Sequence, residues 1–291
     1  MSREEAVGTC CASCGVAEID DIKLVPCDDC DLVKYCSDEC QHNHKSEHKE
    51  ACKKRAAELH DELLFKQPET THLGDCPICC VPLPLEETKS GMCYSCSKII
   101  CMGCFYANAF REEQQSCPFC REPLPGTKEE SEKLRMKRVE ANDPVAMCQE
   151  GVEQRKKGDF GRAFEYFTKA AELGNASANW QLAIMYRLGE GVEKDEGKEI
   201  HNLEEAAIGG HSDARFLLGA HEYIGGNYER AVKHYTITAT QGYDNSIKAL
   251  MNMFKEGFME KEDLASALRA HKVAVDATKS PQRDEADKML R

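Results

Sequence analysis

The stretch CCASCGVAEIDDIKLVPCDDCDLVKYCSDECQHNHKSEHKEAC, residues 10–52, contains eight cysteines and three histidines. Eight of these side chains form four closely spaced pairs: Cys11 and Cys14, Cys27 and Cys30, Cys36 and Cys40, His48 and Cys52. A CxxC turn directs two thiolates at one ion, and a spacing of four residues does so from one helix face. The pairs predict two tetrahedral zinc sites. The alternative is a metal-free tail, but so short a segment cannot build an apolar core without staples.

A helix is predicted after the third pair begins. Ser37 suits the N-cap position, and Asp38 and Glu39 suit the first turn, where the helix dipole favours negative charge. Helix-forming residues continue through SEHKEACKKRAAELHDELL. The two wider ligand pairs are therefore expected on this helix.

The words CASC, CDDC and YCSDECQ, followed by His48 and Cys52, resemble a MYND-type zinc finger over residues 11–52. The resemblance implies interleaved sites, with one zinc on Cys11, Cys14, Cys36 and Cys40 and a second on Cys27, Cys30, His48 and Cys52. His44 lies one turn before His48 and competes as a ligand, although the family pattern favours His48. Lys45 stands where an aromatic residue is common. MYND fingers bind short, often proline-rich segments of partner proteins, so the implied activity is binding.

A second cysteine cluster, residues 76–125, reads CPICCVPLPLEETKSGMCYSCSKIICMGCFYANAFREEQQSCPFCREPLP. It contains four CxxC pairs: Cys76 and Cys79, Cys93 and Cys96, Cys101 and Cys104, Cys117 and Cys120. These pairs predict two more zinc ions, which brings the chain to about four. The words YANAFREEQQ predict a short helix that packs Phe105 and Phe110 inward.

CPIC and CPFCREPLP make this cluster resemble a RING-type domain. The cross-braced RING scheme implies one zinc on Cys76, Cys79, Cys101 and Cys104 and another on Cys93, Cys96, Cys117 and Cys120. The sequence departs from the family because all eight ligands are cysteine, Cys96 and Cys101 are unusually far apart, and no tryptophan precedes Cys117. Three cysteines remain and are interpreted as structural: Cys10, Cys80 and Cys148.

Charge and composition narrow the classes of function. The formal charge of -13 argues against nucleic-acid binding, because such proteins usually carry a basic surface. No apolar run approaches the length of a membrane span, and no leader sequence is expected, so the predicted location is the cytosol or the nucleus. Thiols stay reduced there, which favours metal ligation over disulfides. Motifs for hydrolases, kinases and methyltransferases are not seen.

The charged segment 127–143 is predicted to be a solvated, helix-compatible connector, and a repetitive alanine-rich region follows it. Equivalent small residues recur at intervals of 32, 36 and 32, at Ala146, Ala178, Ala214 and Ser246, which marks four units. KAAELGNASA and LGEGVEKD resemble Sel1-like repeats, relatives of the tetratricopeptide repeats, from residue 143 to about residue 275.

Each repeat unit is predicted to be a pair of antiparallel helices. In the second unit one stripe comprises Ala178, Leu182, Ala183 and Tyr186, and the partner stripe comprises Ile200, Leu203, Ala206 and Ala207. Gly189 and Gly191 separate them, and Phe160, Phe164 and Phe167 serve the first unit. The expected fold is multidomain, with two small zinc-stabilised domains, residues 10–60 and 74–125, before an all-α helical-repeat solenoid, residues 143–291.

Two classes of function compete. In the first, the chain is a RING-type ubiquitin ligase that recruits substrates through its repeats and MYND finger. The resemblance then assigns Ile78 and Pro118 to contact with a ubiquitin-conjugating enzyme and Arg121 to orienting ubiquitin. The alternative for these three is packing on a zinc knuckle or a solvated charge. In the second class the chain is a non-catalytic adaptor. Both predict zinc-dependent binding to other proteins, without nucleic acid or membrane partners.

Overall fold

The computed structural model describes residues 10–111 and 116–289. The chain divides into two compact units, Met1–Lys66 and Gln67–Arg291, and each is described by itself. The second cysteine cluster and the repeats thus belong to the same unit. The boundaries 10–60, 74–125 and 143–291 stay predictions.

The first unit consists of a small hairpin and one long helix. Strands β1 (Val25–Pro26) and β2 (Lys34–Tyr35) pair antiparallel, and α1 spans Asp38–Leu64. Ser37 caps α1 as predicted, because its hydroxyl accepts a hydrogen bond from the Cys40 amide at 3.3 Å. Apart from Leu24 and Tyr35, the buried hydrophobic cluster of this unit consists of cysteines: Cys11, Cys27 and Cys30.

The second cysteine cluster folds around another hairpin. A 3-10 turn, η1 (Glu87–Lys89), leads into β3 (Ser90–Cys93), which pairs antiparallel with β4 (Lys98–Cys101) before α2 (Met102–Arg111). The predicted short helix is therefore present. Phe105 packs against the buried cluster of Leu83, Ile100 and ligand cysteines, whereas the side chain of Phe110 lies outside the described residues.

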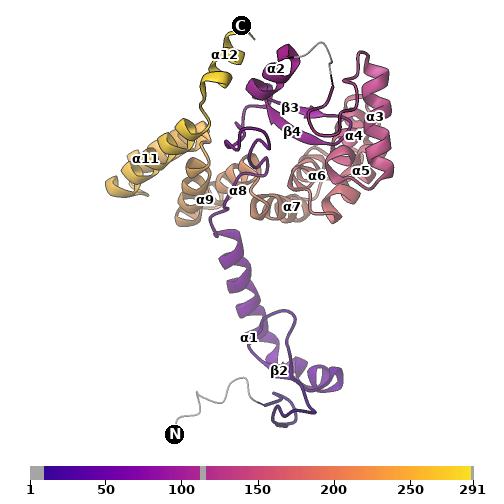
Figure 1. Cartoon of the computed structure of the whole chain (residues 1–291). Helices are drawn as coiled ribbons and strands as arrows, with labels where there is room; N and C mark the ends of the chain where they lie inside the picture. Colours follow the sequence, from indigo (N-terminus) through magenta and orange to yellow (C-terminus); the bar gives the residue numbers. More distant parts are fainter. Residues whose placement is uncertain (1–9, 112–115, 290–291) are drawn as a thin grey trace. The chain divides into compact units, whose positions relative to one another are not determined.

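Ten helices follow. They are α3 (Lys128–Glu140), α4 (Pro144–Lys156), α5 (Phe160–Glu172), α6 (Ala176–Leu188), α7 (Glu196–Ile208), α8 (Ser212–Ile224), α9 (Tyr228–Thr240), α10 (Asp244–Lys255), α11 (Lys261–Ala277) and α12 (Pro281–Met289). Helices α4 to α11 stack as four consecutive pairs (Figure 1). This confirms the predicted solenoid. Asp143, Asn175 and Asp195 begin their helices by accepting a backbone hydrogen bond.

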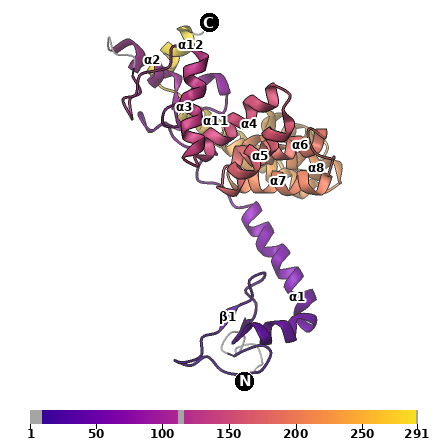
Figure 2. The same cartoon turned by 90° about the vertical axis from the view of Figure 1, so that its right-hand side faces the viewer.

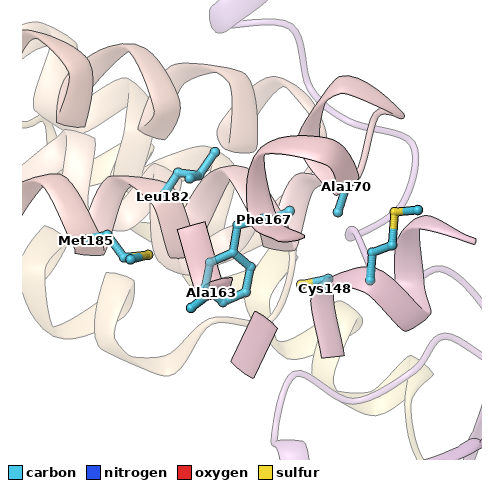
Figure 3. Close-up of a cluster of buried hydrophobic side chains, with 8 residues drawn as sticks. Cys148, Ala163, Phe167, Ala170, Leu182 and Met185 are labelled. Carbon is cyan, nitrogen blue, oxygen red and sulfur yellow. The ribbon is translucent and has the colours of Figure 1, made fainter. Parts of the chain in front are cut away.

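Small residues allow the helices of a pair to approach closely. Ala146, Ala178, Ala214 and Ser246, which mark the repeat, are all buried to 1% exposure or less. At Gly151 an added Cβ would lie 2.6 Å from the ring of Phe167, and at Gly219 it would lie 2.7 Å from that of Tyr235. Figure 3 shows Phe167 beside Ala163 in the core of the first pair, with Leu182 and Met185 of the next helix.

The predicted solvated connector is wrong in one respect. Helix α3 is charged, but it packs on α4 and buries Arg135, whose Nε lies 2.7 Å from Oε2 of the equally buried Glu150. The segment therefore extends the helical stack. Charge composition alone did not reveal this, because a buried ion pair looks like a solvated one in the sequence.

The second cysteine cluster contacts other parts of its unit, among them the turn before α8 and helix α12. In the segment before Cys76, His72 donates its amide to the Gly210 carbonyl at 3.1 Å, and its ring stacks on that of His211 with centroids 4.0 Å apart. At the other end of the unit, α12 packs beside α2, as Figure 1 and Figure 2 both show. None of the helices in the described ranges is long and apolar enough to span a membrane.

Candidate metal centres and the groove beside them

The first centre joins the N-terminal loop to the start of α1. The sulfur atoms of Cys11, Cys14, Cys36 and Cys40 all lie within 4.8 Å of one another. Cys14 and Cys36 are 3.5 Å apart, and Cys36 and Cys40 are 3.6 Å apart. Four ligands at ~2.3 Å from a zinc ion form a tetrahedron with edges of ~3.8 Å, so the spacing fits a zinc ion.

The second centre is built from the hairpin and the middle of α1. It brings together Cys27, Cys30, His48 and Cys52, with 3.1 Å between the Cys30 sulfur and His48 Nε2. His44, the competing ligand, is instead paired with Tyr35, whose hydroxyl lies 3.1 Å from His44 Nδ1. Tyr35 was not among the residues predicted from the sequence. The two centres have the interleaved pairing that the family resemblance implied.

The third centre lies in the second unit, between the Cys76–Cys79 turn and the start of α2. The sulfurs of Cys76, Cys79, Cys101 and Cys104 form one group. The Cys101 amide points at the Cys76 sulfur at 3.5 Å. Burial would raise the pKa of Cys76, but amide donors of Cys101, Cys79 and Ile78 lower it to about 7. Backbone donors thus favour a thiolate here.

The fourth centre brings together Cys93, Cys96 and Cys117, and 3.7 Å separates the sulfurs of Cys96 and Cys117. Cys120, the expected fourth ligand, is exposed and lies outside this group. Its sulfur is 3.0 Å from the Ser95 hydroxyl. Its assignment as a ligand therefore stays a proposal. The third and fourth groups are nevertheless cross-braced as the RING-type scheme implied.

The donor sets are those of zinc. Burial, followed by repulsion from Cys117, raises the pKa of Cys93 to about 12. Such clusters cannot hold several thiolates without a cation, and a divalent ion reverses the effect because it deprotonates the thiols it binds. Cys and His donors in compact groups of three or four fit a structural zinc site. The chain is a zinc-binding protein with about four centres.

Besides Cys120, three cysteines lie outside these groups. Cys148 is buried in the core of the first repeat pair, where burial raises its pKa to about 12. Cys80 is exposed and follows the first knuckle with a φ of 54°. Cys10 is also exposed. A buried, protonated thiol such as Cys148 packs as an apolar residue.

The residues assigned to contact a conjugating enzyme are at the surface. Ile78 is 43% exposed on the first knuckle. Pro118 and Arg121 are exposed on the last knuckle, and Arg121 has a φ of 60°. The structure therefore places all three where a partner could reach them, but it assigns no role to them.

A groove runs along the first unit beside the second centre. It has a volume of about 500 Å³, and Cys27, His48 and Cys52 are among its lining residues. Lys45, Lys49 and Lys53 line it from α1, and Asp29 and Asp38 complete its charged lining. The position where MYND fingers commonly have an aromatic residue therefore places an ammonium group at the groove.

Comparison with known proteins assigns these parts. Residues 11–52 match the MYND finger, and residues 146–175, 176–211 and 212–243 match the Sel1 repeat. The chain carries a MYND finger and Sel1 repeats. The matches cover three of the four helix pairs, and α10 and α11 continue the array beyond them.

Similar proteins match this chain over part of its length. The chain is 31% identical over 86 residues to chitin synthase regulatory factor 4 of Schizosaccharomyces pombe, which is 29% of this chain and 14% of that protein. A Sel1 repeat protein from Oxalobacter formigenes matches 53% of this chain and 66% of its own at 29% identity, with a TM-score of 0.46. A protective antigen of uropathogenic Escherichia coli that displays an SLR fold matches 57% and 37% at 22% identity, with a TM-score of 0.42.

Proposed function

We propose that this chain is a zinc-stabilised adaptor that binds other proteins through its MYND finger and its Sel1 repeats. The observation that carries the proposal is the groove beside the second centre. Zinc fixes one wall of the groove, because three of its lining side chains, Cys27, His48 and Cys52, are also candidate ligands. The repeats supply a rigid helical array for a second contact. The proposed location is the cytosol or the nucleus.

The charges of the groove suggest the kind of segment it binds. Lys45, Lys49 and Lys53 are spaced four residues apart, so one face of α1 presents three exposed ammonium groups to the groove. Tyr35 and Ala56 also line the groove and add apolar surface to it. We therefore infer that the partner segment combines a proline or other apolar residue with acidic side chains.

Binding of labelled peptides to the zinc-loaded full chain tests this inference by fluorescence anisotropy. A proline-containing peptide with acidic flanks should bind about tenfold more tightly than the same peptide with lysine flanks. Lys49→Glu should reverse the preference, whereas Lys54→Glu, an exposed position of α1 outside the groove, should not. Equal binding of both peptides would contradict the acidic specificity. No binding of either would contradict the use of the groove.

A second candidate function, ubiquitin ligation, is favoured by the cross-braced third and fourth centres together with the exposed Ile78. In this function the second cysteine cluster, residues 76–125, acts as a second finger that holds a conjugating enzyme, and no covalent intermediate forms on this chain. Ile78 and Pro118 supply the apolar contact, Arg121 orients ubiquitin, and Cys120 completes the fourth zinc site. An exposed apolar anchor of this kind can dominate a small interface.

Autoubiquitination with a panel of conjugating enzymes separates the two functions. If the chain is a ligase, Ile78→Ala should abolish most transfer while zinc content and thermal stability stay unchanged. Cys76→Ser should abolish transfer by unfolding the finger, and Ile19→Ala, an exposed apolar residue of the MYND unit, should leave it intact. If the wild-type chain shows no ubiquitin transfer but still binds peptides, the ligase function is contradicted and the adaptor function is supported.

A further inference from the structure

Arg283 of α12 reaches the third metal centre from the far end of the chain. Its Nη2 donates to the Cys79 sulfur at 3.5 Å, although the two residues are 204 positions apart. Nη2 also donates to the Val81 carbonyl at 3.0 Å, and Nη1 donates to the Pro82 carbonyl at 2.6 Å. A fourth bond, from Nη1 to the Thr278 carbonyl at 2.7 Å, holds the guanidinium to the turn before α12. The side chain of Arg283 thus binds three consecutive parts of the turn that begins at Cys76: the Cys79 sulfur and the carbonyls of Val81 and Pro82.

Arg283 is a buried cation. The residue is only 7% exposed, and its Nε is buried without a partner. Within the described parts of the chain, no aspartate or glutamate forms an ion pair with it. A buried cation is costly unless an anion faces it. The ionisable groups that face it are the thiols of Cys79 and Cys101, and four thiolates around one zinc ion carry a net charge of about -2.

The backbone of the second finger is shaped to receive α12. Gly103 lies in the first turn of α2, and a Cβ at this position would meet the Arg283 nitrogen at 2.9 Å and the Gln282 carbonyl carbon at 2.9 Å. Both are backbone atoms, so a side chain here would push α12 away. Ala286 of α12 is also buried to 2% exposure. This close approach does not depend on the charge of Arg283. It is therefore independent evidence that α12 packs at a specific position on α2.

We propose that α12 is a metal-dependent latch, in which Arg283 is the counter-charge and positioning residue of the third zinc centre. The loaded centre holds the guanidinium, and the guanidinium shields the thiolates and ties the C-terminal helix to the finger. Loss of zinc removes the thiolates that balance the buried charge of Arg283. Helix α12 therefore dissociates from α2. A cavity of about 510 Å³, lined by residues such as Leu83, Tyr243, Val275 and Arg283, is bounded by this latch and opens with it.

Two site-resolved measurements on the zinc-loaded full chain test the latch. The first is the rate at which N-ethylmaleimide alkylates each cysteine, read by peptide mass spectrometry. The second is deuterium uptake of α12, residues 281–289, before and after chelation. In the wild type, chelation should increase uptake in α12 well before it does so in α11. Arg283→Met keeps the apolar stem but removes the charge, and it should raise alkylation of Cys79 and Cys101 by ~10- to 100-fold.

Other variants separate the latch from general loss of folding. Gly103→Ala should reproduce the effect of Arg283→Met without touching any ligand, and Arg283→Lys should give a smaller one. Arg269→Met, an exposed arginine of α11, and Gly91→Ala, where the nearest contact is an ordinary 3.6 Å, are the matched controls. Alkylation of Cys27 and Cys30 should not change in any variant. The proposal is overturned if Arg283→Met and Gly103→Ala both show the alkylation rates of the wild type. It is also overturned if deuterium uptake in α12 is the same with and without zinc.

Discussion

The residues buried in the MYND unit are mostly candidate zinc ligands, whereas the buried clusters of the Sel1 repeats consist mainly of alanine, leucine, methionine and aromatic residues. The MYND unit has too little apolar surface to fold without its metal, so metal binding supplies its folding free energy. The repeats bury continuous apolar stripes between neighbouring helices. Two segments of one chain therefore depend on different conditions for their stability.

The second finger stands between these extremes. Its buried cluster includes Leu83 and Ile100 as well as ligand cysteines. It is also held from outside, by His72 at the turn before α8 and by α12 at α2. A small domain can thus gain stability from metal, from its own core and from the domain beside it. The predictions below test this difference, from the largest expected effect to the smallest.

Chelation should separate the two regions most strongly. A strong chelator should unfold residues 11–52 completely, because structural zinc contributes on the order of 10 kcal/mol or more to such fingers. The far-ultraviolet circular dichroism of the helical repeats should largely persist. Zinc measured by atomic absorption should be about four ions per chain before treatment. Loss of most helical signal at the same chelator concentration would contradict independent stabilisation.

The buried ion pair between α3 and α4 should give the largest effect of a single substitution in the repeats. Glu150→Gln leaves Arg135 buried beside a neutral group and should cost ~3–5 kcal/mol in urea unfolding. The double replacement Arg135→Met with Glu150→Leu should recover much of this loss, since both charges are then absent. Zinc content should not change. A cost near zero for the single variant would mean that α3 is solvated, as its composition suggested.

The stability of the repeats should depend on the volume of their core side chains. The repeat spacing indicates which second substitution should restore the stability that Gly151→Ala removes. Gly151→Ala places a methyl group against Phe167 and should cost ~1–3 kcal/mol by overpacking. The corresponding positions of the second unit are Ala183 and Leu203, both fully buried. Phe167→Leu combined with Gly151→Ala should therefore be more stable than Gly151→Ala alone in thermal unfolding. Additive losses would show that the two units pack differently.

Acid should weaken the repeats slightly through His211. Burial, followed by the neighbouring His72, holds the pKa of His211 well below its usual value. The unfolded chain therefore binds a proton first, and stability is lost as the pH falls below about 6.5. His211 Nδ1 accepts the Ala214 amide at 3.4 Å at the start of α8, which requires an unprotonated nitrogen. We expect the free energy of unfolding to fall by ~1 kcal/mol, the contribution of one helix N-cap. His211→Asn should make the free energy of unfolding less dependent on pH.

Local patterns in the sequence were sufficient for several features. Ligand pairs depend on spacings of three or four residues, so CxxC turns and the capped helix after Ser37 could be predicted directly. The repeat period at Ala146, Ala178, Ala214 and Ser246 predicted the stacked helix pairs, because small residues must recur wherever helices approach closely. Family resemblance was needed for the interleaving of the zinc pairs, since spacing within a pair does not say which pairs meet.

Only the tertiary structure decided the contacts between distant segments. The sequence contains no local sign that Arg283 meets Cys79, that Arg135 is buried with Glu150, or that Cys120 lies outside its expected group. A charged side chain has the same local pattern whether it is solvated or buried, because its environment is set by residues far away in the chain. The sequence therefore determined which residues could bind metal and which helices would stack. Long-range packing determined how the second finger is joined to the repeats, because that contact depends on shape and charge brought together from both ends of the unit.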